Sequence, residues 1–238
     1  MDARAAEADA SGPTVVFTQV ALDVDATGRV VKAEPDAQLA PVLREPARKA
    51  AMGWRFAPIT EHGKAVAGTT YANMRLCLVP DGDAFNVAAD LIGNGPGTVQ
   101  SARIPLLPPP PKGLPEGVEF SAKVRYQVKP DGRATLQYAE LADPMQQARN
   151  GTTWRRHVSQ WLSKRRFMPE VVNGTPVATV VDLPLTYELR GLGSLQEVQR
   201  KVAERNAEHA QQVCRVAAGE AQNRAVAVDS RFTRAGEG

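Results

Sequence analysis

The sequence has few of the features that assign a chain to a membrane or to catalysis. Its 238 residues contain no run approaching the roughly 18 uncharged apolar residues that a membrane-spanning helix needs. It has three histidines, and none of them has a second histidine or a cysteine at the spacing of metal ligands. Phosphate-loop, dinucleotide-binding and Gly-x-Ser-x-Gly motifs are missing as well. We therefore expect a chain that does not itself span a membrane, with no metal, no cofactor and no catalytic residues.

An excess of charge of one sign is missing too. Lys and Arg total 29 against 26 Asp and Glu, so the formal net charge of +3 is too weak to indicate a nucleic-acid partner. Basic residues do gather in one predicted helix, which also carries Trp154 and Trp161. Aromatic and basic residues together can bind nucleic acid, but both tryptophans fall on the apolar stripe of this helix. We interpret its outer face as a charged or protein-docking patch. The patch consists of Arg155, Arg156, Lys164 and Arg165.

The most informative feature that is present is an internal repeat. Segment 54–66, WRFAPITEHGKAV, has the same spacing as segment 165–177, RRFMPEVVNGTPV, which lies 111 positions later. Upstream, Thr27-Gly28 corresponds to Asp131-Gly132 at an offset of 104. A repeat of this kind predicts two similar structural units in succession. The shared residues that we assign to a structural corner are Arg55, Phe56 and Pro58 in the first copy, and Arg166, Phe167 and Pro169 in the second.

Each copy predicts the order strand, strand, helix, strand. Alternating apolar residues lead into and out of the turns at Gly28 and Gly132, which is typical of a β-hairpin. An amphipathic helix follows and ends at a corner, where the phenylalanine folds under the sheet and the proline stops the helix. A glycine turn then leads into the last strand, at 66–78 or 177–189. The apolar helix positions are Leu43, Ala47, Ala50, Ala51 and Trp54 in the first copy, and Trp154, Val158, Trp161 and Leu162 in the second.

These patterns predict an α+β fold of two β-β-α-β units plus a long C-terminal helix. Each unit is a three-stranded antiparallel sheet with one helix across a face. The predicted boundaries are 1–13 for a flexible N-terminal tail, 14–80 for the first unit, 81–116 for a Gly- and Pro-rich linker, 117–191 for the second unit, 192–226 for the C-terminal helix and 227–238 for a flexible tail.

Two of these segments have more than one interpretation. Within the linker, Pro108 to Pro111 predict a short polyproline II rod, and a docking motif for a proline-reading module is the alternative. The C-terminal helix has a thin apolar stripe that predicts packing on a domain over part of its length. Homodimerisation through this helix is the alternative.

The residues of the repeat resemble the C-terminal domain of TonB, the periplasmic energy transducer. Members of that family have a strand ending in Asp-Gly, a helix ending in Trp-Arg-Phe-x-Pro and a Gly-x-x-Val turn into a last strand. Here these are Asp131-Gly132, Trp54 to Pro58 and Gly63 to Val66, and Asp182 to Tyr187 is similar to the family's closing strand. The resemblance implies the fold of each unit and a periplasmic location. The sequence departs from the energy transducers because it shows no membrane helix and no long charged Pro-rich spacer, and because it has two domains. We expect a signal peptide or anchor to be absent from the chain as given.

The resemblance also implies non-catalytic protein binding. An exposed strand edge would capture an extended segment of another protein, such as an outer-membrane transporter, by main-chain hydrogen bonds. The alternative is a soluble periplasmic inhibitor or immunity protein that neutralises a toxin or cell-wall-targeting effector. Two strand edges are candidates, although Pro184 removes a donor from the second. The candidate edge residues are Tyr71, Asn73 and Arg75 in the first copy, and Val180, Asp182 and Tyr187 in the second.

The periplasmic location that the resemblance implies bears on the two cysteines, Cys77 and Cys214. In an oxidising compartment, an even cysteine count favours pairing. We predict a disulfide that fixes the C-terminal helix to the first unit, and two separately buried thiols are the alternative.

Overall fold

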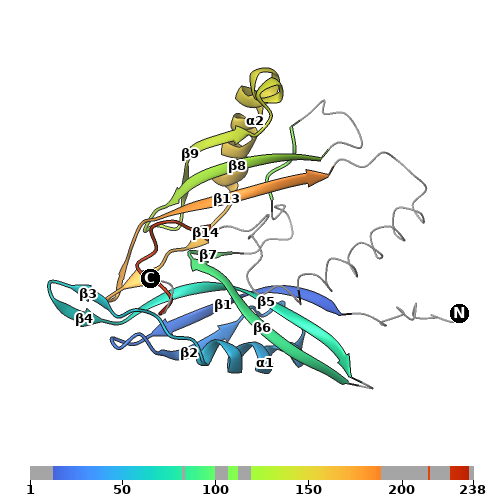
Figure 1. Ribbon diagram of the computed structural model, residues 1–238. Helices are drawn as coiled ribbons and strands as arrows, with labels where there is room; N and C mark the ends of the chain where they lie inside the picture. The colour runs from blue at the N-terminus through green and yellow to red at the C-terminus, as the bar shows by residue number, and fades with distance from the viewer. Residues whose placement is uncertain are drawn as a thin grey trace, which may run out of the picture.

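The strands and helices of the computed structural model form antiparallel sheets with helices packed against them (Figure 1). The structure describes residues 13–81, 84–99, 107–111, 119–188, 214 and 226–235. Within these residues there are two helices, and the expected mixed α+β class is confirmed. Neither of these helices is long and apolar enough to cross a membrane. Nearly all of the predicted C-terminal helix at 192–226, and the predicted N-terminal tail up to residue 12, lie outside the described residues.

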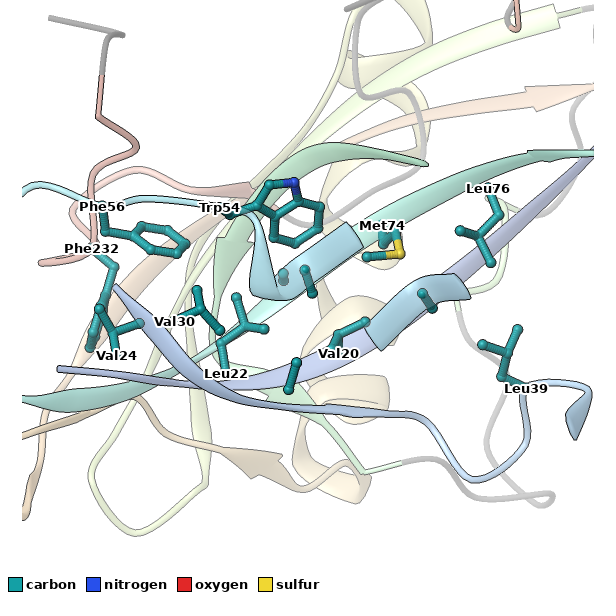
Figure 2. Packing of buried hydrophobic residues seen from close by; sticks show 14 of the residues in the cluster. Val20, Leu22, Val24, Val30, Leu39, Trp54, Phe56, Met74, Leu76 and Phe232 are labelled. Carbon is teal, nitrogen blue, oxygen red and sulfur yellow. The ribbon is translucent and has the colours of Figure 1, made fainter. Parts of the chain in front are cut away.

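The first half of the chain forms a sheet in the order β2-β1-β5, with a helix packed on one face. Apolar residues alternate along the central strand β1, so that Val20, Leu22 and Val24 all face the core. Figure 2 shows Leu22, Met74 and Phe56 pointing into one cluster. The elements of this half are β1 (Thr14–Val24), β2 (Val30–Pro35), α1 (Pro41–Met52), β3 (Ile59–Glu61), β4 (Lys64–Val66) and β5 (Gly68–Asp81).

The second half repeats this strand order as β9-β8-β13. Its helix α2 has 21 residues against 12 in α1, and the extra turns lie at its N-terminal end. There Asp143 caps the helix, because its Oδ1 accepts a hydrogen bond from the Gln146 N–H at 2.8 Å. The elements are β8 (Glu119–Val128), β9 (Ala134–Leu141), α2 (Pro144–Lys164), β10 (Phe167–Met168), β11 (Val171–Val172), β12 (Thr175–Pro176) and β13 (Thr179–Glu188).

The corner phenylalanine of each half packs against the glycine of the hairpin turn. The Phe56 N–H donates to the Gly28 carbonyl at 2.8 Å, and the Phe167 N–H donates to the Gly132 carbonyl at 2.9 Å. Both glycines have positive φ, 82° and 75°. A Cβ atom on Gly28 would lie 1.9 Å from the Phe56 carbonyl oxygen, and one on Gly132 would lie 2.4 Å from that of Phe167. Each turn therefore needs glycine for two reasons, its backbone conformation and the closeness of the corner.

The predicted glycine turn before each last strand is a small hairpin of its own. Gly63 and Gly174 occupy the tips of β3–β4 and β11–β12, after His62 and Asn173. All four residues have positive φ, which is the geometry of a two-residue type I′ turn. The last strands therefore begin later than predicted, at Gly68 and Thr179.

The segment predicted as a linker contains two strands, so the linker prediction is wrong there. β6 (Ala84–Gly95) pairs antiparallel with β5, and β7 (Gly97–Thr98) pairs with β10. Apolar residues alternate along β6 as Phe85, Val87, Ala89 and Leu91, and the last three pack against the first core. This alternation, and not the glycine content of 93–97, determines the local structure.

The two halves share a sheet and a hydrophobic core. β11 pairs with the start of β5, which brings Val172 into the first core. The C-terminal segment contributes β14 (Val226–Ala227), which pairs with β13. Phe232 is 2% exposed and inserts into the first core, where its ring meets Phe56 edge-on (Figure 2). The prediction of a flexible tail from 227 is therefore wrong as far as residue 235.

Candidate protein-binding surfaces

The first predicted strand edge, at Tyr71, Asn73 and Arg75, is not an edge. β1 pairs with β5 from Gly68 to Leu78 on one side, and β6 pairs with it from Tyr71 to Asp81 on the other. The prediction is wrong because the supposed linker folds back as β6. The Arg75 side chain is buried, and its Nη2 lies 2.7 Å from Asp90 Oδ2 on β6.

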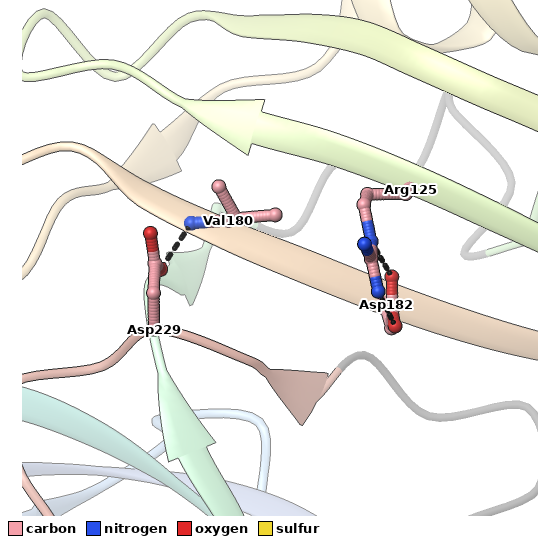
Figure 3. A network of polar contacts seen from close by, with 4 residues as sticks. All are labelled: Arg125, Val180, Asp182 and Asp229. Carbon is pink, nitrogen blue, oxygen red and sulfur yellow. Dashed lines mark hydrogen bonds and ion pairs between the residues drawn. The ribbon is translucent and has the colours of Figure 1, made fainter.

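The second predicted edge, on β13, is partly covered by the C-terminal segment. Val181 pairs with Ala227 and Asp182 pairs with Val226. The Val180 N–H donates to Asp229 Oδ1 at 2.6 Å (Figure 3). This part of the strand is therefore already hydrogen-bonded on both sides.

The side chains of the second predicted edge also have partners within the chain. Asp182 binds Arg125 of β8 through both carboxylate oxygens, each at 2.6 Å (Figure 3). This pairing raises the pKa of Arg125, chiefly through the hydrogen bonds to Asp182. Tyr187 donates its hydroxyl to the Pro108 carbonyl at 2.8 Å. Backbone groups alternate sides along a strand, so the backbone of Pro184 lies on the same outer side of β13 as those of Val180 and Asp182. Because proline has no N–H, it cannot donate a hydrogen bond to an added strand there.

The outer side of β6 is a longer edge. Within the part of the chain that the structure describes, β6 pairs with β5 alone from Ala84 to Leu91. The Ala67 carbonyl, just before β5, accepts a hydrogen bond from the Asn173 N–H, so it points to the side of β5 where β11 and β6 lie. Backbone groups alternate sides along a strand, so those of every second residue from Ala67, including Cys77, also point to that side. Cys77 pairs with Ala88, so the backbone groups of Ala88 point to β5 and those of the next residue, Ala89, point to the outer side.

Several features that normally block strand addition are missing from β6. Its twelve residues include no proline, lysine or arginine, and Phe85, which lies at the end of β6 next to the connection from β5, is 53% exposed. In the sequence, the glycines at 93–97 favour a loop and therefore predict a linker in place of an edge strand. The alternation of apolar residues from Phe85 to Leu91 was the signal that could have identified it.

Three of the four residues predicted for the basic patch lie on the surface. Arg155, Arg156 and Lys164 are exposed. Arg165 is only 4% exposed, with its guanidinium carbon 4.9 Å from the centre of the Trp161 ring. Burial lowers the pKa of Arg165. The patch prediction is therefore wrong for Arg165, since the helix has already ended and the chain turns inward there.

A cavity of about 300 Å³ lies at the C-terminal end of α2. Two guanidinium groups and a hydroxyl in one place can hold a carboxylate. No group of three or more His, Cys, Asp or Glu within the described residues could hold a metal ion. The cavity is lined by Arg133, Ala134, Leu162, Ser163 and Arg166.

A buried carboxylate that the sequence interpretation missed lies where the two halves meet. Glu170 is completely buried and accepts hydrogen bonds from three hydroxyls: Thr70 Oγ1 at 2.6 Å, Ser230 Oγ at 2.8 Å and Thr179 Oγ1 at 2.9 Å. These hydroxyls belong to β5, the C-terminal segment and β13. One difference between the two copies could have identified this carboxylate in the sequence. The first copy has an apolar residue, the buried Ile59, at the position where the second copy has Glu170.

The predicted disulfide is confirmed. Cys77 and Cys214 are bonded, with their Cα atoms 5.6 Å apart. Cys77 follows the core-facing Leu76 on β5, so its side chain lies on the opposite face of the sheet from α1. A disulfide of this kind is compatible with an oxidising compartment.

Comparison of the chain with protein-family models, with curated proteins and with solved structures finds no match.

Proposed function

We propose that the protein is a non-catalytic binding protein of the periplasm that captures an extended segment of another protein at the outer side of β6. The observation that carries this proposal is the length of that edge. From Ala84 to Leu91, β6 has one strand neighbour among the described residues and contains no proline, lysine or arginine. An added strand would gain main-chain hydrogen bonds, and the exposed Phe85 would contact its side chains.

Two further observations support a relation to the TonB C-terminal domain. The order strand, strand, helix, strand occurs twice, and the sheets have the matching orders β2-β1-β5 and β9-β8-β13. The disulfide suits the periplasm, where outer-membrane transporters and cell-wall-directed effectors present segments that such a protein could bind.

A proline at position 89 tests the proposal. Ala89→Pro removes an outward N–H, and edge strands tolerate proline where the N–H faces away from the ladder. Ala89→Ser is the matched control because it keeps the N–H. The wild-type protein and both variants would be cross-linked to partners in periplasmic extract, and the recovered partner segment would be titrated as a synthetic peptide.

We expect the serine variant to bind like the wild type and the proline variant to bind roughly tenfold more weakly, since one main-chain hydrogen bond and close contact are lost. Equal affinity of all three proteins would contradict strand addition at β6.

A second candidate, an inhibitor or immunity protein, is supported by the cavity that contains Arg133 and Arg166. Together with the exposed Arg155 and Arg156, these residues suit an acidic partner surface. Under this alternative, Arg133→Glu with Arg166→Glu would abolish binding, and Ala89→Pro would leave it unchanged.

A further inference from the structure

The proline-rich segment 107–111, LPPPP, has the sequence of a polyproline II recognition ligand. The described part of the chain contains no cis peptide bond, and a proline ring together with a following proline restricts Pro108, Pro109 and Pro110 to the polyproline II region. That helix has three residues per turn, so residues three apart share a side. Pro108 and Pro111 are buried, Pro109 is exposed and Pro110 is half-buried. The burial therefore follows the Pro-x-x-Pro spacing.

Two aromatic side chains donate hydrogen bonds to these prolines, and a third aromatic side chain stacks on one of the two. Phe120 of β8 and Tyr187 of β13 stack with ring centres 4.9 Å apart and planes at 16°. Trp154 of α2 is completely buried, and its Nε1–H donates to the Pro109 carbonyl at 3.0 Å. The Tyr187 hydroxyl donates to the Pro108 carbonyl at 2.8 Å. Burial raises the pKa of Tyr187, so the hydroxyl remains protonated and can donate at neutral pH.

In both hydrogen bonds, from Trp154 and from Tyr187, the donor and the acceptor each need a partner that the other supplies. A polyproline II helix makes no internal hydrogen bonds, so its carbonyls are free to accept. A buried indole N–H or phenol hydroxyl is costly without an acceptor. Flat rings pack well on proline rings, and the stiff ligand loses little entropy on binding. Phe120, Trp154 and Tyr187 come from three different elements and belong to one hydrophobic cluster, against which Leu107 also packs.

We propose that Phe120, Trp154 and Tyr187 form a binding groove for polyproline II segments, that the chain's own residues 107–111 fill it as an internal ligand, and that a Pro-x-x-Pro segment of a partner protein exchanges with them. The groove is separate from the β6 edge, and its test does not depend on binding there. A tethered ligand acts at an effective concentration on the order of millimolar, so a free segment competes weakly until the internal one is loosened.

Paired alanine variants of the full chain test this proposal. Pro108→Ala with Pro111→Ala removes the two rings that face the groove, whereas Pro109→Ala with Pro110→Ala removes the two that face outward. Both variants lose two prolines from the same segment, so they soften it equally. The probe is a fluorescent peptide, Leu-Pro-Pro-Pro-Pro-Lys, and the control peptide is Leu-Ala-Pro-Pro-Ala-Lys. Binding is measured by fluorescence anisotropy.

The first variant should bind the probe at least about tenfold more tightly than the wild type or the second variant, and the control peptide should bind none of the three. Equal affinities for the three proteins, or equal affinities for the two peptides, would overturn the proposal.

A measurement on the wild-type protein covers the case in which the first variant does not fold. Of the three indole N–H resonances, only that of Trp154 should shift when the probe is added at millimolar concentration. No shift, or an equal shift with the control peptide, would also overturn the proposal.

Discussion

The contact between a turn glycine and a corner phenylalanine occurs once in each half. It joins two motifs that lie about 28 residues apart in the first half, Gly28 and Phe56. The same pairing of Gly132 with Phe167 explains why the hairpin turn and the Arg-Phe-x-Pro corner both recur in the repeat. Each corner closes the hairpin against the end of its helix.

Alanine at Gly28 should destabilise the protein more than alanine at Gly63. Both glycines have positive φ, which costs a residue with a Cβ roughly 1–2 kcal/mol. A Cβ at Gly63 meets nothing within 4 Å, but one at Gly28 overlaps the Phe56 carbonyl oxygen. We expect Gly63→Ala to lower the free energy of unfolding by about 1 kcal/mol and Gly28→Ala by more than about 2 kcal/mol, measured by urea unfolding. Equal losses would show that the Phe56 contact adjusts without cost.

At the level of elements, the sequence predicted the parts that local patterns determine. The two β-β-α-β orders follow from alternation, helical spacing and turn glycines within each copy. The strand β6 was missed because Gly93, Gly95 and Gly97 favour a loop, although the alternation from Phe85 to Leu91 favours a strand. Composition and periodicity predict different structures for this segment, and tertiary pairing with β5 favours the strand.

The candidate surfaces were harder to predict for a physical reason. Whether a strand edge is open depends on which segment pairs beside it, and that segment can lie far away in the sequence. Val226 covers Asp182 from 44 positions further along the chain (226 minus 182). The aromatic groove likewise depends on three elements meeting, and each residue alone has the spacing of an ordinary core position.

The disulfide should contribute strongly to stability because it closes a long loop. Cys77 and Cys214 are separated by 137 residues. In the chain-entropy model, such a bond stabilises the folded state by about 5 kcal/mol. We expect the double variant Cys77→Ala, Cys214→Ala to lower the free energy of unfolding by roughly 3–5 kcal/mol in urea.

Reductant provides the control for the disulfide. It should destabilise the wild-type protein by a similar amount and leave the double variant unchanged. If reductant has no effect on the wild type, the bond does not contribute to stability in this way.

At the scale of the whole molecule, the two halves share core residues, strand pairing and a buried carboxylate, so we expect them to unfold together. Val172 of the second half and Phe232 of the C-terminal segment complete the first core. β11 extends the first sheet, and β7 pairs with β10. Glu170 connects β5, β13 and the C-terminal segment through its three hydroxyl donors. A tandem repeat would otherwise be free to unfold one unit at a time.

Replacing Glu170 by isoleucine, the residue at the equivalent position of the first copy, should therefore destabilise both halves together. The substitution keeps side-chain bulk. It leaves the buried hydroxyls of Thr70 and Thr179, and the half-buried hydroxyl of Ser230, without their acceptor. A buried hydroxyl without an acceptor costs about 1–3 kcal/mol. Thr70 Oγ1 can turn to the Gly95 carbonyl oxygen, which lies 3.5 Å away, and the half-buried Ser230 can turn to water, so we expect a total loss of roughly 2–4 kcal/mol.

Hydrogen exchange of the central strands β1 and β8 measures this effect in each half separately. Protection of both strands should fall by the same factor, roughly 30- to 1,000-fold, because both exchange through the same global unfolding. Thr179→Val, which removes one donor and keeps the shape of the side chain, is the control and should lower protection in both strands by about tenfold or less. If Glu170→Ile accelerates exchange in β1 but not in β8, or in β8 but not in β1, the halves unfold independently and the shared carboxylate does not couple them.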